Sequence, residues 1–183
     1  MDEAGFSTKP SRATTWGAIG KTPVLKIAGR GWKKVSAAGA LTVSPGDRGG
    51  KRRRAGQFFQ LYEHDIDGAT FAGFVRALLR RVRGRVTFVW DGLAVHWAPA
   101  VKAVLARYKR VSVCRLPAHA PELNPVEPMW ANSKAVRMRG YVAEDIDDLA
   151  SEAGVCLDEI AQDHHLLRWF FDATPLTLKG VTK

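Results

Sequence analysis

The sequence has few cysteines, no long hydrophobic run and a deficit of acidic residues. The 183 residues include two cysteines, Cys114 and Cys156, which have no partners at metal-ligand spacing. No apolar run approaches the roughly 20 residues that span a bilayer, and no charged-then-apolar leader opens the chain. We therefore expect a soluble, cytoplasmic protein without a membrane partner, in which both cysteines are reduced and lie in the core.

The acidic deficit is the strongest compositional signal. Lys and Arg number 28 against 18 Asp and Glu, which gives a net charge of +10 and a pI near 10.0. A polyanionic partner such as nucleic acid explains this imbalance, and the alternative is a generally arginine-rich proteome. The basic residues crowd the first third of the chain. Within it, Arg52, Arg53 and Arg54 fall in a predicted hairpin loop, where they either contact phosphates or form a solvated tip.

The length fits a single α/β domain covering residues 1–183, with a core at about 1–139 and a C-terminal helical segment at 140–173. Between residues 7 and 64, short β-rich runs alternate with turns, which predicts an antiparallel meander. The runs are Thr14–Gly17, Val24–Ala28, Val35–Val43 and Gln57–Glu63.

From Asp67 onwards, helical and strand patterns alternate, which predicts parallel strands joined by helices. Asp67 is the expected N-cap of a helix that Gly84 ends. A second helix follows Pro99, and Val111–Leu116 reads as a buried strand. The last part of the chain is predicted to be helical, with the 166–171 stretch packed against the body of the protein.

Two carboxylates stand at positions that suit a catalytic role. Asp91 follows the apolar run at 86–90, as expected of a strand that delivers a carboxylate to its C-terminal tip. Glu127 follows Asn124 and Pro125, which together predict a helix start with Asn124 as N-cap. Each has a structural alternative: Asp91 as an ordinary turn residue before Gly92, and Glu127 as a residue that caps its helix.

Three sequence blocks resemble the DDE transposases of the insertion-sequence 630 and mariner group. These are DEAGF at 2–6, DGLAVH at 91–96, and LPAHAPELNPVEPMW at 116–130 followed by Lys134. The resemblance runs from Asp2 to about Arg139. The chain departs from the group at Gly92, where Asn is usual, and at His119 and Ala120, where a Tyr-Ser type pair is common.

The resemblance implies a ribonuclease H-like fold, in which helices flank a mixed central sheet of an antiparallel meander and parallel strands. In that fold the first strand is central and carries the first aspartate. Only Met1 precedes Asp2, whereas a strand typically has roughly 5 to 6 residues. The leading part of this strand and the group's upstream helix-turn-helix region are therefore expected to be absent from this chain.

The resemblance also implies a chemistry. Asp2, Asp91 and Glu127 would be the catalytic metal ligands for two Mg²⁺ ions, with Mn²⁺ as a possible substitute, in cleavage and strand transfer of DNA phosphodiesters at insertion-sequence ends. The implied partners are transposon-end and target DNA, a second copy of the chain, and an upstream helix-turn-helix polypeptide. A prokaryotic, nucleoid-associated location follows from the same resemblance.

Several alternatives stay open on the sequence alone. The chain is either an active catalytic domain or a truncated remnant that binds DNA nonspecifically, and a cellular ribonuclease H-like nuclease or resolvase is a third reading. Glu3 competes with Asp2, and Glu122 with Glu127. His96 either contacts DNA or enters a helix, and Lys134 either contacts phosphate or covers apolar surface. Trp130 is expected in the core.

Overall fold

The computed structural model describes residues 1–9, 16–24, 32–44 and 53–176. Three antiparallel strands form one sheet in the order β1-β2-β3, and two parallel strands, β4 and β5, form a second sheet. The strands are β1 (Asp2–Ser7), β2 (Lys34–Val43), β3 (Ala55–Tyr62), β4 (Val86–Trp90) and β5 (Val111–Arg115).

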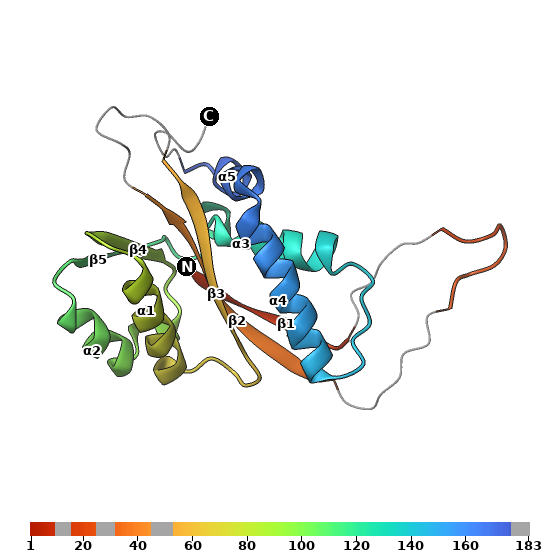
Figure 1. Cartoon of the computed structure of the whole chain (residues 1–183), viewed down its shortest axis with the longest axis horizontal. Coiled ribbons are helices and arrows are strands. Elements are labelled where there is room, and N and C mark those ends of the chain that lie inside the picture. The colour runs from red at the N-terminus through yellow and green to blue at the C-terminus, as the bar shows by residue number, and fades with distance from the viewer. Residues whose placement is uncertain (10–15, 25–31, 45–52, 177–183) are drawn as a thin grey trace.

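Helices cover both faces of the larger sheet (Figure 1). The α-helices are α1 (Gly68–Arg81), α2 (Pro99–Arg107), α3 (Val126–Asn132), α4 (Ile146–Gln162) and α5 (His164–Asp172). Two short 3-10 helices, η1 (Ala94–Trp97) and η2 (Pro121–Leu123), and a π-helical turn, η3 (Ser133–Arg137), complete the described elements. No helix among the described ranges is long and apolar enough to cross a membrane.

Alternate residues of β2 face two separate cores. Val35 and Ala37 pack in the core formed with α3, α4 and α5, whereas Ala38 and Ala40 pack in the core formed with α1, α2 and β4. This is the two-residue period of a strand that is buried on both faces. Figure 1 shows α4 and α5 on one side of the three-stranded sheet, and α1 and α2 with β4 and β5 on the other.

Helix α3 docks closely on β2 because Gly39 has no side chain. A Cβ at Gly39 would lie 2.6 Å from the Trp130 ring, so only glycine admits the ring at this point. Trp130 is 3% exposed and meets Phe6 edge-to-face, which confirms the prediction that it lies in the core. The contact fixes α3, and with it Glu127, over the edge of the sheet that β1 forms.

The starts and ends of the helices follow local sequence signals. Asp67 Oδ1 accepts a hydrogen bond of 2.7 Å from the Thr70 amide, which confirms the predicted cap of α1. Gly84 and Gly140 adopt positive φ angles of 78° and 74°, conformations that favour glycine after a helix. Asp145 caps α4 in the way that Asp67 caps α1, by accepting from the Asp148 amide.

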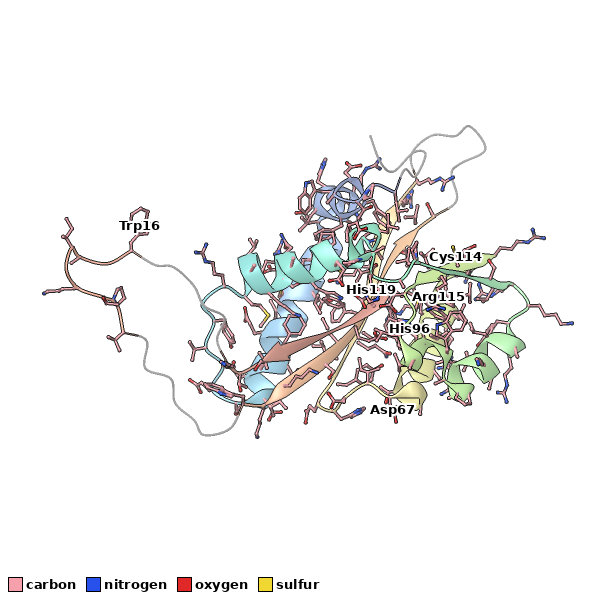
Figure 2. All side chains as sticks on the ribbon, turned by 180° about the vertical axis from the view of Figure 1, so that it is seen from behind. Trp16, Asp67, His96, Cys114, Arg115 and His119 are labelled. Carbon is pink, nitrogen blue, oxygen red and sulfur yellow. The ribbon has the colours of Figure 1, made fainter. Side chains whose placement is uncertain are left out.

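The predicted meander is partly confirmed. The runs Val35–Val43 and Gln57–Glu63 correspond to β2 and β3. The runs Thr14–Gly17 and Val24–Ala28 lie largely outside the described residues, and their described positions, 16, 17 and 24, are not in strands. Trp16 is fully exposed and lies away from the rest of the protein (Figure 2).

The strand predicted at Val111–Leu116 is confirmed as β5, but the prediction that it is buried is wrong. The strand β5 is paired on one side only, and three of its five residues, Ser112, Cys114 and Arg115, are exposed. The expected core position of Cys114 is therefore wrong as well, because its side chain lies on this edge strand. Cys156 is buried in α4 as predicted, and both cysteines are free.

Candidate active site

The first strand places two neighbouring carboxylates on opposite faces of the sheet. Asp2 and Phe6 are an even number of positions apart in β1, so their side chains point to the same face of the sheet. Phe6 packs against Trp130 on the α3 side, and Asp2 therefore faces α3. Glu3 points to the other face, toward η1. The Met1 ammonium donates a 2.9 Å hydrogen bond to the Val89 carbonyl of β4, and this bond joins the two sheets at the start of β1.

Acidic groups gather around this buried amino terminus. Burial lowers the pKa of the Met1 ammonium to about 6, although the negative charges of Asp2, Glu3 and Asp91 oppose the shift. All three carboxylates are therefore close enough to act on the same nitrogen. The start of β1 and the end of β4 thus meet where the two sheets adjoin, with Asp2 and Asp91 near the same nitrogen.

Asp2 and Glu127 repel each other across the junction of β1 and α3. The Asp2 side chain is buried, and its pKa is raised to about 7, first by loss of solvent and then by the Glu127 carboxylate. Both effects disfavour the ionised form of Asp2, and they outweigh the backbone hydrogen bond and the amino-terminal charge that favour it. The structure brings these two predicted site residues together.

Lys134 lies beside this acidic pair. Its Nζ is 5.7 Å from the centroid of the Phe6 ring, and the side chain is half-buried. Burial lowers the pKa of Lys134, and the charges of Glu127 and Asp2 act in the opposite direction. The lysine therefore covers apolar surface with its stem while its charge faces the two carboxylates.

Helix α3 begins one residue later than predicted. Pro125 occupies the cap position, and Val126 is the first helical residue. Asn124 still contributes, because its Oδ1 accepts from the Val126 amide at 3.3 Å and its carbonyl accepts from the Glu127 amide at 3.0 Å. In the described part of the chain the Glu127 carboxylate makes no capping bond and is exposed, which leaves it free for another role.

His96 links the carboxylate on the other face of β1 to Asp91. Its Nε2 lies 2.8 Å from Glu3 Oε1 and forms a hydrogen bond with it. Its Nδ1 lies 2.9 Å from Asp91 Oδ1, a close contact without hydrogen-bond angles. Asp91 Oδ1 also accepts a 3.0 Å hydrogen bond from the Leu93 amide. Asp91 is thus held in a turn, with its carboxylate directly beside the His96 ring.

The imidazole of His96 is fully buried between aromatic rings. Its centroid lies 4.6 Å from that of Phe71 and 5.3 Å from that of Trp90. Neither ring nitrogen is accessible to a DNA phosphate in this buried position, so the predicted DNA contact of His96 does not fit the structure. Its place in η1, directly after the turn that follows β4, matches the alternative of a helix-entry residue.

Gly92, where the chain departs from its family pattern, accommodates Arg115 from β5. A Cβ at Gly92 would lie 2.3 Å from Arg115 Nη2, so the missing side chain gives room to the guanidinium. Figure 2 shows Arg115 and His96 where the ends of β4 and β5 meet. His119, the second departure, is exposed and has a positive φ of 56°. A cation thus lies beside the turn that carries Asp91.

Two of the predicted DNA-contacting arginines, Arg53 and Arg54, lie at the far end of the β2-β3 hairpin. Arg53 and Arg54 precede β3, and the Arg54 amide donates to Ser44 Oγ. Arg52 falls outside the described residues. Glu122, the competitor of Glu127, is exposed in η2.

The arrangement provides part of a metal site. Among residues 1–9, 16–24, 32–44 and 53–176, no three His, Cys, Asp or Glu side chains stand together at metal-ligand spacing. Asp2 and Glu127 face each other, whereas the Asp91 carboxylate is directed to His96. The oxygen-only donor set and the repulsion between Asp2 and Glu127 fit a hard divalent cation such as Mg²⁺ or Mn²⁺.

A mixed α/β fold with acidic side chains from β1, β4 and a following helix defines a class of metal-dependent nucleases. The chain belongs to the DDE superfamily endonucleases, whose family model matches residues 1–150. It is therefore related to transposase-type enzymes that cleave DNA. No curated protein sequence matches the chain significantly.

The fold is that of the ribonuclease H-like DDE transposases. The Mos1 mariner paired-end complex with Mn matches with a TM-score of 0.65 at 18% identity, over 95% of this chain and 51% of that one. The Mos1 transposase paired-end complex with left transposon end gives 0.63 at 17% identity, over 94% and 49%. The chain thus spans about half the length of these proteins.

Sequence reasoning missed the pairing of Glu3 with His96. Glu3 was considered only as a competitor of Asp2, and His96 only as a DNA contact or helix-entry residue. Strict alternation along β1 was a usable signal, because it places Glu3 on the face that Asp2 does not occupy. The sequence carries no signal for the pairing itself, since the two residues are far apart along the chain.

Proposed function

We propose that this domain cleaves and transfers DNA phosphodiester bonds at the ends of an insertion sequence, with Asp2, Asp91 and Glu127 as its catalytic carboxylates. The observation that carries the proposal is the interaction of the buried Asp2 with the exposed Glu127 beside the end of β4, in a chain of the DDE endonuclease family. A buried carboxyl such as Asp2, whose pKa is raised by loss of solvent and by a neighbouring carboxylate, is typical of a functional site.

The three carboxylates would hold divalent metal, with two Mg²⁺ ions as the proposed complement and Mn²⁺ as a substitute. When bound, the metal supplies activation of a water or a 3′-hydroxyl and stabilisation of the leaving oxygen. Asp2 and Glu127 contribute oxygen ligands from a strand and a helix that Trp130 fixes against each other. His96 orients Asp91 through its Nδ1 and is a positioning residue, because it touches a ligand and not the substrate.

Basic side chains around the carboxylates suit a DNA substrate. Lys134 lies beside Asp2 and Glu127, and Arg115 lies beside the turn that carries Asp91. Arg53 and Arg54 add positive charge at the end of the β2-β3 hairpin, and the net charge of +10 favours association with a polyanion. We propose transposon-end and target DNA as partners, acting with a second copy of the chain and an upstream helix-turn-helix polypeptide in a prokaryotic cytoplasm.

The test is metal-dependent nicking of a supercoiled plasmid by the purified protein. We expect nicking in Mg²⁺ or Mn²⁺ and none in EDTA. Asp91→Asn and Glu127→Gln should each lower the rate at least about 100-fold, because a neutral amide is a poor ligand for a hard cation. Glu122→Gln, at another exposed carboxylate in η2, is the matched control and should retain the full rate. Nicking that persists in both site variants would contradict the assignment.

A second candidate is a remnant that binds DNA without cutting it. It is favoured by one observation, the absence of a three-ligand set at metal spacing in the described part of the chain. It predicts salt-sensitive DNA binding with no nicking in either metal. A cellular nuclease or resolvase would instead cut an RNA-DNA hybrid or a branched junction in preference to linear duplex, so these two substrates complete the assay.

A further inference from the structure

Charge is divided between the two sides of the three-stranded sheet. Residues 68–115, which include α1, β4, α2 and β5, contain ten Lys or Arg and one acidic residue, Asp91. Residues 141–176, which include α4 and α5, contain nine Asp or Glu and one basic residue, Arg168. The two parts lie on opposite sides of the sheet (Figure 1). One side of the protein is therefore strongly basic and the other strongly acidic.

A groove of about 260 Å³ lies between α1 and α2 on the basic side. Small apolar side chains line it: Ala69, Ala72, Ala100, Ala103 and Val104. Arg76 of α1 and Arg107 of α2 line it as well, and both are exposed. Neither guanidinium forms an ion pair or a hydrogen bond with another residue that the structure describes. The groove thus combines an apolar lining with two unpaired cations.

Helix α4 presents an exposed face of the opposite charge. Residues at spacings of three and four share one face of a helix, and here the five residues at such spacings are all exposed. They are Asp147, Ser151, Val155, Asp158 and Gln162. Val155 is 52% exposed and lies in the middle of this face. Neither aspartate has an ion-pair or hydrogen-bonding partner for its carboxylate within the described ranges.

We propose that the α1-α2 groove of one molecule binds the exposed face of α4 from a second copy, with Val155 against the alanines. The two aspartates of that face then meet the two arginines of the groove. One molecule cannot make this contact with itself, because the two surfaces lie on opposite sides of its sheet. Both kinds of contact contribute, since exposed ion pairs alone add little to binding while complementary charge selects the partner and its orientation.

A second copy matches the groove better than a nucleic acid does. A DNA phosphate would pair with the arginines, but it would leave the alanine lining against a charged, hydrated strand. The face of α4 supplies an apolar side chain and acidic groups together. The contact is head-to-tail, because each molecule uses its groove for one neighbour and its α4 face for another. Such a contact is not closed by a two-fold axis, so it allows assemblies larger than a dimer.

Sedimentation velocity of the purified chain, without metal or DNA, tests this contact separately from the proposed cleavage. At about 50 mM NaCl we expect the average sedimentation coefficient to rise as the protein concentration is raised. At about 500 mM NaCl it should return to the value of the monomer, because salt screens the opposite charges.

Reversing the charge of either surface should lower the association constant at least about 10-fold. The groove variant is Arg76→Glu with Arg107→Glu, and the α4 variant is Asp147→Lys with Asp158→Lys. Arg83→Glu with Arg85→Glu is the matched control for the groove variant. It makes the same change in net charge within the basic part, at exposed residues that do not line the groove, and should associate as the wild-type chain does. Circular dichroism verifies that each variant is folded.

An equimolar mixture of the groove variant and the α4 variant distinguishes the head-to-tail arrangement. The groove variant retains only its α4 face, and the α4 variant retains only its groove. We therefore expect each variant to be monomeric alone, and the mixture to form a 1:1 dimer that does not grow further. Sedimentation equilibrium gives the mass.

A wild-type chain that stays monomeric at low salt up to about 200 µM would overturn the proposal, and this measurement needs no variant. A dimer that persists in both variants would place the contact elsewhere, and a mixture that stays monomeric would exclude the pairing of these two surfaces. An equal loss in the matched control would assign the association to general charge. If the wild-type chain is monomeric and the groove variant loses affinity for a labelled duplex, the groove is a DNA surface instead.

Discussion

At the scale of single residues, the candidate site depends on a buried histidine that is shared by two carboxylates. His96 is fully buried, bonds to Glu3 and contacts Asp91. Its ring also stacks with Trp90 of β4, so its position is set by packing as well as by charge. A change at this residue therefore tests both the stability of the fold and the orientation of Asp91.

We expect His96→Leu to destabilise the protein by about 2–4 kcal/mol, because the Glu3 carboxylate, 14% exposed, loses its partner. Urea unfolding at neutral pH measures this cost. The double variant Glu3→Leu with His96→Leu should recover part of the loss, since no buried charge is then unpaired. A single-variant cost below about 0.5 kcal/mol, or a double variant that is less stable than the single one, would contradict the role of the pair.

At the scale of secondary-structure elements, the packing of α3 on β2 decides where Glu127 lies. We expect Gly39→Ala to destabilise the protein by about 1–3 kcal/mol, because the new Cβ would lie 2.6 Å from the Trp130 ring. Chemical unfolding measures the change. Gly73→Ala in α1 is the matched control, since a Cβ there meets nothing within 4 Å. It should be neutral or stabilising by up to about 1 kcal/mol. Equal costs at both positions would exclude the close contact as the cause.

The capping of α1 by Asp67 predicts a dependence of stability on pH. The Thr70 amide lowers the pKa of Asp67 below its usual value by hydrogen bonding to the ionised form. The group therefore stabilises the folded state above its unfolded pKa, and this contribution is lost as the pH falls through the lower folded pKa. Asp67→Asn keeps a capping oxygen without a titrating group.

We accordingly expect the Tm of the wild-type chain to fall relative to that of Asp67→Asn as the pH is lowered from about 6 to about 2. Thermal unfolding followed by circular dichroism measures both. Asp67→Ala, which lacks the cap altogether, should have the lowest Tm at neutral pH. Parallel pH profiles of the wild-type and Asn chains would show that the Asp67 charge makes no contribution.

The local elements could be predicted from the sequence where a signal lies within a few residues. Asp67 and the apolar spacing after it predicted α1, and the Asn124-Pro125 pair predicted the start of α3 to within one residue. The burial of β5 could not be predicted, because an apolar alternation does not reveal whether a strand has one neighbour or two. Cys114 was misplaced for this reason.

At the scale of the whole molecule, the amino terminus lies in the middle of the fold, between the two sheets (Figure 1). Family motifs predicted that Asp2, Asp91 and Glu127 would be the functional carboxylates, and Asp2 and Glu127 do lie together. The direction of the Asp91 carboxylate could not be predicted, because it depends on His96 and on the aromatic rings around it. Such contacts arise only when distant segments pack.

The charge of the whole molecule leads to a prediction about DNA binding. If Arg53 and Arg54 contact phosphates, each contact releases counterions and contributes a slope of about −0.9 to a plot of log affinity against log salt concentration. We expect the double variant Arg53→Ala with Arg54→Ala to reduce the slope by up to about 1.8. Lys102→Ala, an exposed cation on α2, serves as the control for the loss of a positive charge elsewhere.

Fluorescence anisotropy with a labelled duplex between about 50 and 200 mM KCl measures these slopes. A smaller slope in the arginine variant alone places DNA at the end of the β2-β3 hairpin. An equal reduction in both variants indicates that the general charge of the protein acts and not a specific contact. An unchanged slope in the arginine variant excludes the hairpin end, and the phosphate contacts are then to be sought at Lys134 and Arg115 beside the carboxylates.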